Sequence, residues 1–166
     1  MVHIGIIPDG NRRWCKNNNH ELKDLTQKWI EFIIKILYQW TRLNNLKKIN
    51  EINEINEINE ISIYISSIDN INRNDNTKNI IEKTLKELIN IINNEEGKYE
   101  NKYYNDIRKF MKKILENYEI NVIGDIDILS ENIKKELMKY KNNKNNKKKY
   151  VLNIAYAYDY YKDILN

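Results

Sequence analysis

Near its N-terminus the chain reads Ile4-Gly-Ile-Ile-Pro-Asp-Gly-Asn-Arg-Arg-Trp14. The apolar run Val2–Pro8 is typical of a strand that is covered on both faces, and helical spacing of apolar residues is clear from Leu25 onward. A strand, a glycine turn and a helix favour an anion site, because amides at a helix start and the helix dipole attract phosphate. The alternative is an ordinary turn, since Asp-Gly and Gly-Asn are common turn dipeptides.

The charged side chains of this stretch have the chemistry of a diphosphate site. Arg12 and Arg13 supply forked donors for phosphate oxygens. Asp9 is an acid in a site for anions, and this is explained if it holds a divalent cation that bridges to the phosphates. A nucleotide-binding or phosphate-binding module is the alternative, but the sequence contains neither a G-x-x-x-x-G-K-[ST] loop nor a G-x-G-x-x-G fingerprint.

Length and composition limit the class of protein. The 166 residues predict a single domain over residues 1–166, and the net charge of +4 is too mild and too dispersed among 24 acids to indicate a nucleic-acid partner. A single cysteine excludes an internal disulfide and favours a reducing compartment. No apolar run approaches the ~20 residues of a membrane span. We therefore expect a cytoplasmic protein whose contact with a membrane, if any, is peripheral.

Strand-like and helix-like segments alternate along the chain. The expected strands are Val2–Pro8, Ile61–Ser66, Ile120–Gly124 and Tyr150–Ala155, and the expected helices cover about 11–17, 24–43, 80–92, 103–115 and 130–137, with a last one beginning near the end. This order predicts an α/β domain with a mainly parallel sheet flanked by helices. Ligands of such sheets bind at the carboxyl ends of the strands, so Asp9 and Ser66-Ser67 are expected to face one cleft.

Two segments have biased composition. Residues 49–60 repeat Ile-Asn-Glu with a period of three, which keeps no face of a helix or strand apolar, so we interpret them as a low-complexity insert in a loop, for which a helical start is an open alternative. Residues 141–149 consist entirely of Lys and Asn and are expected to form a solvated linker.

A second polar cluster, Ser67-Ile-Asp-Asn-Ile-Asn-Arg73, follows the second expected strand and by itself is typical of a polar turn. Together with the first stretch it makes the chain resemble the cis-prenyltransferases, the undecaprenyl and dehydrodolichyl diphosphate synthase family. Residues His3–Trp14 look like that family's H-x-x-x-I-x-D-G-N-x-R-W signature, and Tyr64–Arg73 look like its Y-x-F-S-x-E-N-W-x-R. Shorter likenesses to I-G-D and L-N-I-A-x-x-Y occur at Asn121–Asp125 and Leu152–Tyr158.

The resemblance implies a specific chemistry. The family condenses isopentenyl diphosphate onto an allylic diphosphate to give a polyprenyl diphosphate with Z double bonds, requires Mg²⁺ and holds the growing chain in an apolar tunnel. By resemblance, Asp9 is the essential carboxylate and Mg²⁺ ligand, and Asn11 assists at the reacting carbon. The implied substrate-binding residues are Gly10, Asn11, Arg12, Arg13, Trp14, Ser67, Asn70 and Arg73. A homodimer, or a heterodimer with a fuller-length relative, is also implied.

The sequence departs from the family pattern in three places. The family's G-H-x-x-G segment is replaced by Leu25-Thr-Gln-Lys-Trp29, and Asp69 and Ile71 stand for the Glu and Trp of the second motif. The usual C-terminal section, whose R-x-x-G-E-x-R-x-S-N segment binds isopentenyl diphosphate, has no counterpart. The resemblance therefore implies either a shortened active enzyme or a catalytically inactive or partner-dependent subunit that binds a prenyl diphosphate.

Overall fold

Strands and helices alternate in the computed structural model, which describes residues 2–50, 57–73, 75–93, 102–141 and 148–165. Short 3-10 turns lie at Leu22–Asp24 and Ile126–Ile128. No helix in these ranges has the length and apolar character of a membrane span. The strands and helices are β1 (Val2–Ile6), α1 (Asn11–Asn17), α2 (Leu25–Asn50), β2 (Ile58–Tyr64), α3 (Ile68–Ile71), α4 (Thr77–Asn93), α5 (Lys102–Asn117), β3 (Tyr118–Ile123), α6 (Glu131–Lys141), β4 (Tyr150–Ala155) and α7 (Tyr160–Leu165).

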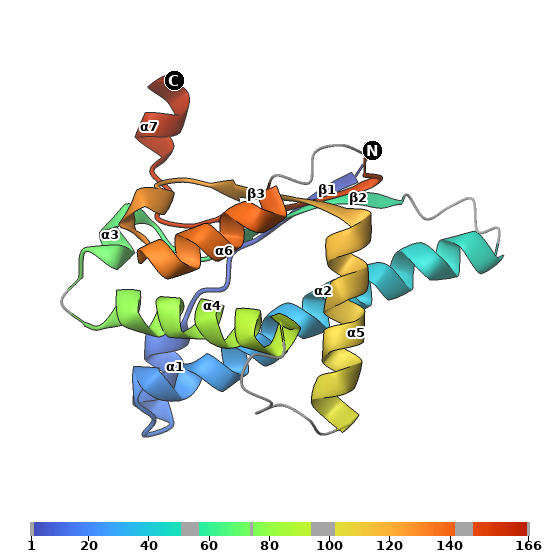
Figure 1. Ribbon diagram of the computed structural model, residues 1–166. Coiled ribbons are helices and arrows are strands. Elements are labelled where there is room, and N and C mark those ends of the chain that lie inside the picture. Colours follow the sequence, from blue (N-terminus) through green and yellow to red (C-terminus); the bar gives the residue numbers. More distant parts are fainter. Residues whose placement is uncertain (1, 51–56, 74, 94–101, 142–147, 166) are drawn as a thin grey trace.

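The four strands form one sheet in the order β1-β2-β4-β3, and every neighbouring pair is parallel. The register places Ile6 beside Ile63, and Ile63 in turn beside Ile154. This arrangement confirms the parallel α/β sheet expected from the sequence. Because all four strands run the same way, the turns that follow β1 and β2 meet at one edge of the sheet (Figure 1).

The hydrophobic core lies between one face of the sheet and helices α2, α4 and α5 (Figure 1). Alternate residues of β2, such as Ile61 and Ile63, turn towards Leu37 and Trp40 of α2 and Ile114 of α5, and all of these side chains are buried. This is the period-two pattern of the strand meeting the apolar stripe of the helices. These three helices thus cover one face of the sheet with apolar side chains.

The expectation of a loop over residues 49–60 is wrong at its second end, whereas its first end is helical. Helix α2 continues to Asn50, and β2 begins at Ile58. The main chain of Ile58 is fixed by two buried side chains: its carbonyl accepts from Trp40 Nε1 at 2.8 Å and from Asn44 Nδ2 at 2.9 Å, and its N–H donates to Asn44 Oδ1 at 3.2 Å. Tertiary contacts therefore define β2 where the period of three could not. Residues 51–56 lie outside the described residues.

Two further boundaries differ from the sequence prediction. Strand β3 begins at Tyr118 instead of Ile120, because Tyr118 pairs with Tyr150 of β4 and its ring packs 4.6 Å from that of Trp40. Residues 141–149 were expected to form a linker. Lys141 is instead the last residue of α6, and residues 142–147 lie outside the described residues.

The opposite face of the sheet carries a row of polar side chains that crosses all four strands. Asn121 of β3 donates to Asn153 of β4 at 3.1 Å, and Asn153 donates to Ser62 at 3.0 Å and Glu60 at 2.5 Å on β2. The row ends on β1, where His3 Nε2 lies 2.8 Å from Ser62 Oγ. Helices α2, α4, α5 and α6 all lie on the other side of the sheet (Figure 1).

A close approach of two main-chain segments ties the ends of β3 and β4 together. Gly124 follows β3 with φ of +106°, and a Cβ atom at this position would lie 2.1 Å from the carbonyl oxygen of Tyr156. The neighbouring Tyr156 N–H donates to the Ile123 carbonyl at 2.9 Å. Both the backbone conformation and the space require glycine here.

We expect Gly124→Ala to lower the free energy of unfolding by about 2 kcal/mol or more, since the methyl group must displace backbone and adopt an unfavourable φ. Urea unfolding followed by circular dichroism measures this. Gly5→Ala in β1 is the matched control, because no atom lies within 4 Å of a Cβ built there. A comparable loss in both variants would contradict the argument.

The hydroxyl group of Tyr156 is buried without a hydrogen bond to any described residue that would offset its loss of contact with water. Its side chain is 1% exposed, and the hydroxyl has no hydrogen-bond partner among the described residues. Burial raises the pKa of Tyr156 to about 12. The unfolded chain releases this proton near the ordinary tyrosine pKa of about 10. The folded state thus binds more protons above that pH, and its stability falls as the pH rises from about 10 to 12.

We expect Tyr156→Phe to leave the free energy of unfolding at pH 7 unchanged or to raise it, because an uncompensated buried hydroxyl is removed. The variant should also lose less stability between pH 7 and pH 10.5 than the parent chain. Urea titrations at both pH values test this, with the half-exposed Tyr38→Phe as control. Equal pH sensitivity in parent and Tyr156→Phe would show that this phenol does not contribute.

Candidate active site

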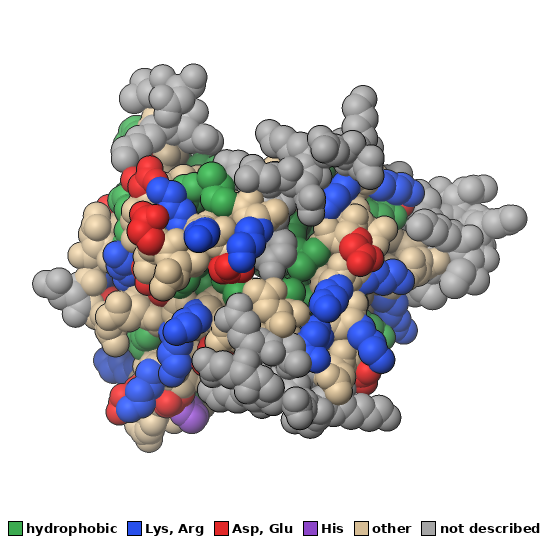
Figure 2. Space-filling model, in the orientation of Figure 1, with side chains coloured by type: hydrophobic (Ala, Val, Ile, Leu, Met, Phe, Trp, Pro, Cys, Tyr) green, Lys and Arg blue, Asp and Glu red, His purple; other side chains and the backbone are tan. Residues whose placement is uncertain are grey.

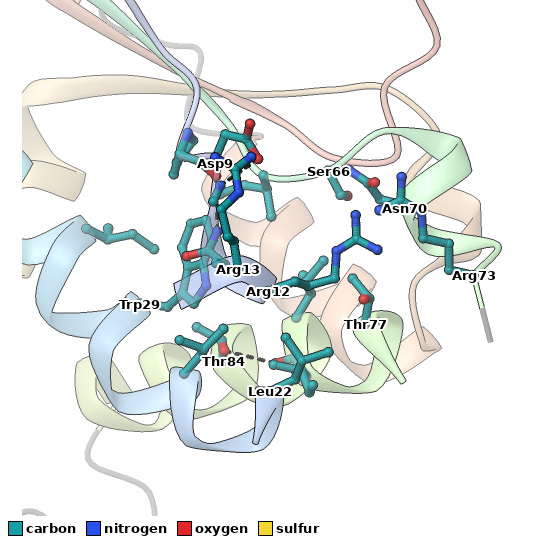
Figure 3. Close-up of a pocket in the computed structure, with 18 of the residues that line it drawn as sticks. Asp9, Arg12, Arg13, Leu22, Trp29, Ser66, Asn70, Arg73, Thr77 and Thr84 are labelled. Atoms are coloured by element: carbon teal, nitrogen blue, oxygen red, sulfur yellow. Dashed lines mark hydrogen bonds between the residues drawn. The ribbon is translucent and has the colours of Figure 1, made fainter. Parts of the chain in front are cut away.

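A pocket of about 570 Å³ opens at the carboxyl ends of β1 and β2 (Figure 3). Its walls come from the turn after β1, from α1, from the start of α2, from the turn after β2 and from the first half of α4. One end of the pocket is polar and cationic, and the other is apolar. The lining residues are Pro8, Asp9, Gly10, Asn11, Arg12, Arg13, Lys16, Leu22, Leu25, Trp29, Ile33, Ile65, Ser66, Asn70, Arg73, Thr77, Ile80, Ile81, Thr84 and Leu85.

The mouth of the pocket concentrates positive charge. Arg12, Arg13 and Lys16 come from α1, and Arg73 comes from the segment after α3, whereas Asp9 is the single acid among the lining residues. In Figure 3 the Arg12 side chain reaches towards Asn70 and Arg73, while Arg13 turns towards Asp9. Elsewhere on the molecule, Lys and Arg are interspersed with acidic side chains on the face seen in Figure 2. The mouth is therefore suited to a polyanionic group.

The turn after β1 is fixed by its own hydrogen bonds. Gly10 has φ of +88°, a conformation that favours glycine, and its N–H donates to Asp9 Oδ1 at 2.5 Å. Asn11 Nδ2 donates to the Pro8 carbonyl at 3.1 Å, and the Trp14 N–H donates to the Gly10 carbonyl at 2.8 Å. Helix α1 has only seven residues, so the arginine side chains supply most of the attraction for an anion.

The turn after β2 presents one serine to the pocket and uses the next for structure. Ser66 is buried and lines the pocket, and its Oγ accepts from the Ala157 N–H at 3.1 Å. Ser67 caps α3, because its Oγ accepts from the Asn70 N–H at 3.0 Å. The Ser67 cap therefore supports the short helix that carries Asn70 into the lining.

Among the residues that the sequence implied for substrate binding, all but Trp14 and Ser67 line the pocket. Trp14 stacks on His20 with ring centroids 5.0 Å apart, and Lys28 Nζ lies 5.3 Å from the Trp14 ring centroid. Ser66 lines the pocket with Asp9, as its place at the end of a strand predicted. The lining also includes polar residues that the sequence argument did not assign, namely Lys16, Thr77 and Thr84, of which Lys16 lies one helical turn after Arg12 and Arg13.

The floor of the pocket is apolar and is built on the same helices as the core. Leu25, Trp29 and Ile33 come from one face of α2, and Ile81 and Leu85 come from α4. The hydroxyl of Thr84, also in the lining, donates to the Ile80 carbonyl at 2.9 Å, so its donor is satisfied within α4. The segment Leu25–Trp29, which departs from the family's G-H-x-x-G pattern, thus contributes apolar surface to the floor.

The residues at the mouth allow one mode of Mg²⁺ binding. Asp9 is the single carboxylate in the lining, and no group of three or more His, Cys, Asp or Glu side chains able to hold a metal occurs in the part of the chain that the structure describes. Mg²⁺ is commonly held by one or two carboxylates together with substrate phosphates and water. Asp9 fits this shared mode of binding, in which the diphosphate provides the other ligands, and does not fit a closed protein site.

The fold and the pocket define an α/β protein with a pocket that is cationic at its mouth and apolar at its floor. The sequence model of the prenyltransferase family described as undecaprenyl diphosphate synthase matches residues 7–166. The chain therefore belongs to this family. No curated protein matches the chain by sequence.

Solved structures share the fold. Lavandulyl diphosphate synthase from Lavandula x intermedia, determined in complex with dimethylallyl diphosphate, has a TM-score of 0.68 and 19% sequence identity. A probable undecaprenyl diphosphate synthase from Campylobacter jejuni has a TM-score of 0.52 and 18% identity. Each match covers 98% of this chain and 57% of the other. This chain thus spans little more than half the length of either structure.

Proposed function

We propose that the pocket binds an allylic prenyl diphosphate and that the protein acts in Z-selective prenyl chain elongation, in which isopentenyl diphosphate is condensed onto that substrate. The observation that carries the proposal is the joining of a cationic mouth and an apolar floor in one pocket. A prenyl diphosphate has the matching division, with a polyanionic head and a long hydrocarbon tail.

Both ends of the pocket favour a prenyl diphosphate over a ligand that is only anionic or only apolar. Guanidinium groups bind phosphate oxygens through two parallel hydrogen bonds, and the mouth offers Arg12, Arg13 and Arg73. Hydrocarbon removed from water by the floor contributes about 25 cal/mol per Å². A phosphate-binding module for polar metabolites would have no use for an apolar floor, so the floor argues against that alternative.

The same groups suit the chemistry of an allylic diphosphate. When the bond between the allylic carbon and the diphosphate breaks, negative charge develops on the leaving group, and the arginines of the mouth stabilise it. Mg²⁺ held by Asp9 and the diphosphate would neutralise part of the same charge. In this proposal Asn11 assists at the reacting carbon, and Gly10, Asn70 and the Ser67-capped turn shape the head-group site.

Binding can be tested with farnesyl diphosphate, farnesol and inorganic diphosphate by isothermal titration calorimetry. We expect farnesyl diphosphate to bind at least about 10-fold more tightly than either fragment, because only it uses both ends of the pocket. Arg13→Ala should weaken the binding of farnesyl diphosphate about 10-fold or more and leave the binding of farnesol unchanged. Arg42→Ala, on the exposed side of α2, is the control. Equal affinities for farnesyl diphosphate and inorganic diphosphate would refute a prenyl site.

Condensation is tested separately with farnesyl diphosphate, isopentenyl diphosphate and Mg²⁺. We expect a longer prenyl diphosphate with Z double bonds, and we expect both Asp9→Asn and a chelator to reduce turnover at least about 100-fold. Unchanged turnover of Asp9→Asn would rule out the role given to this carboxylate. Product geometry is read by nuclear magnetic resonance.

A second candidate function is a prenyl-diphosphate-binding subunit that is inactive or depends on a partner. The observation that favours it is the replacement of the family's G-H-x-x-G segment by Leu25–Trp29, which contributes apolar surface to the pocket floor. This hypothesis expects farnesyl diphosphate to bind without product until a fuller-length family member is added as a heterodimeric partner. Robust turnover by the purified chain, as a monomer or homodimer, would exclude it.

A further inference from the structure

An acidic residue outside the predicted motifs faces the arginines of the mouth. Asp75 lies between α3 and α4, and its Oδ2 is 3.6 Å from Nη1 of Arg12, which belongs to α1. The ion pair therefore connects two walls of the pocket. The Asp75 side chain is 29% exposed and that of Arg12 is 58% exposed, so both groups remain accessible to a ligand.

The Asp75 carboxylate is held in place by the start of α4. The Thr77 N–H donates to Asp75 Oδ1 at 3.2 Å, and the Thr77 hydroxyl donates to the same oxygen. These hydrogen bonds, led by that of the Thr77 hydroxyl, lower the pKa of Asp75, and the nearby Arg12 and Arg73 lower it further. Asp75 is thus a fixed negative charge at neutral pH, beside a mouth that attracts anions.

We propose that Asp75 is a positioning residue that holds Arg12 at the mouth of the empty pocket and releases it to the diphosphate when substrate binds. This inference rests on the proposed function. The Nη1 donors of Arg12 that face Asp75 are not available to a diphosphate at the same time, so the two anions compete for this side of the guanidinium. Asp75 keeps Arg12 near the site. It also lowers the affinity of the site for the diphosphate, and this favours release of product.

The fold does not depend on this ion pair. Exposed pairs of this kind contribute little to stability. Asp75→Asn keeps an Oδ1 acceptor for the two Thr77 donors and removes the charge, so the start of α4 should be preserved. The substitution therefore separates the charge of Asp75 from its local structural role, and a thermal melt checks that the variant is folded.

The test is a double-mutant cycle on the affinity for inorganic diphosphate, measured by calorimetry with chelator at low salt for the full chain, Asp75→Asn, Arg12→Gln and the double variant. We expect Asp75→Asn to tighten binding about 5-fold or more in the presence of Arg12 and to change it less than about 2-fold in the Arg12→Gln background. Asp106→Asn, an exposed acid of α5, controls for net charge.

Two outcomes of the double-mutant cycle overturn the inference. Unchanged or weaker binding by Asp75→Asn would show that Asp75 does not compete for Arg12. Equal tightening in both backgrounds would show that the carboxylate repels the ligand directly. If the parent chain fails to bind diphosphate, the proposed function fails. The ion pair is then tested alone by the rate at which phenylglyoxal modifies Arg12, followed by mass spectrometry. A rate at least about 2-fold faster in Asp75→Asn supports the pair, and an unchanged rate overturns it.

Discussion

The parallel pairing of β1 with β2 is the constraint on which the site depends. The register that sets Ile4 beside Ile61 and Ile6 beside Ile63 also fixes where each strand stops. Two turns that are more than fifty residues apart in the sequence therefore begin at the same edge of the sheet. One turn carries Asp9 and leads into the arginines of α1, and the other leads to Asn70 and Arg73. The two turns therefore bring their cationic side chains to the mouth of one pocket.

The pocket and the core share their walls. Helix α2 buries Ile30, Leu37 and Trp40 in the core, and its Leu25 and Trp29 line the pocket floor. The same helix that packs in the core therefore also holds the pocket floor in place. The mouth is different, because it is made of short turns whose side chains are held by individual hydrogen bonds, such as those of Ser67 and Thr77.

The sequence predicted the parts of this arrangement that are local. The segment from Asp9 to Arg13 forms as expected because Gly10 takes a conformation that favours glycine, and α2 and α4 follow from apolar spacing. The strand start at Ile58 was missed because it depends on Trp40 and Asn44, which are distant in the sequence. The floor residues could not be distinguished from core residues, because a pocket wall and a core face have the same helical period. Asp75 carried no signal, since polar residues are common in every turn.

The polar row across the second face of the sheet has a consequence for how the domain meets its surroundings. Parallel sheets are usually covered on both sides, because their strands are apolar on both sides. Here the side chains of Asn121, Asn153, Ser62 and His3 contact one another across the sheet. Among the described residues this face therefore has the polar character of the solvated side of an antiparallel sheet, although all of its strands are parallel.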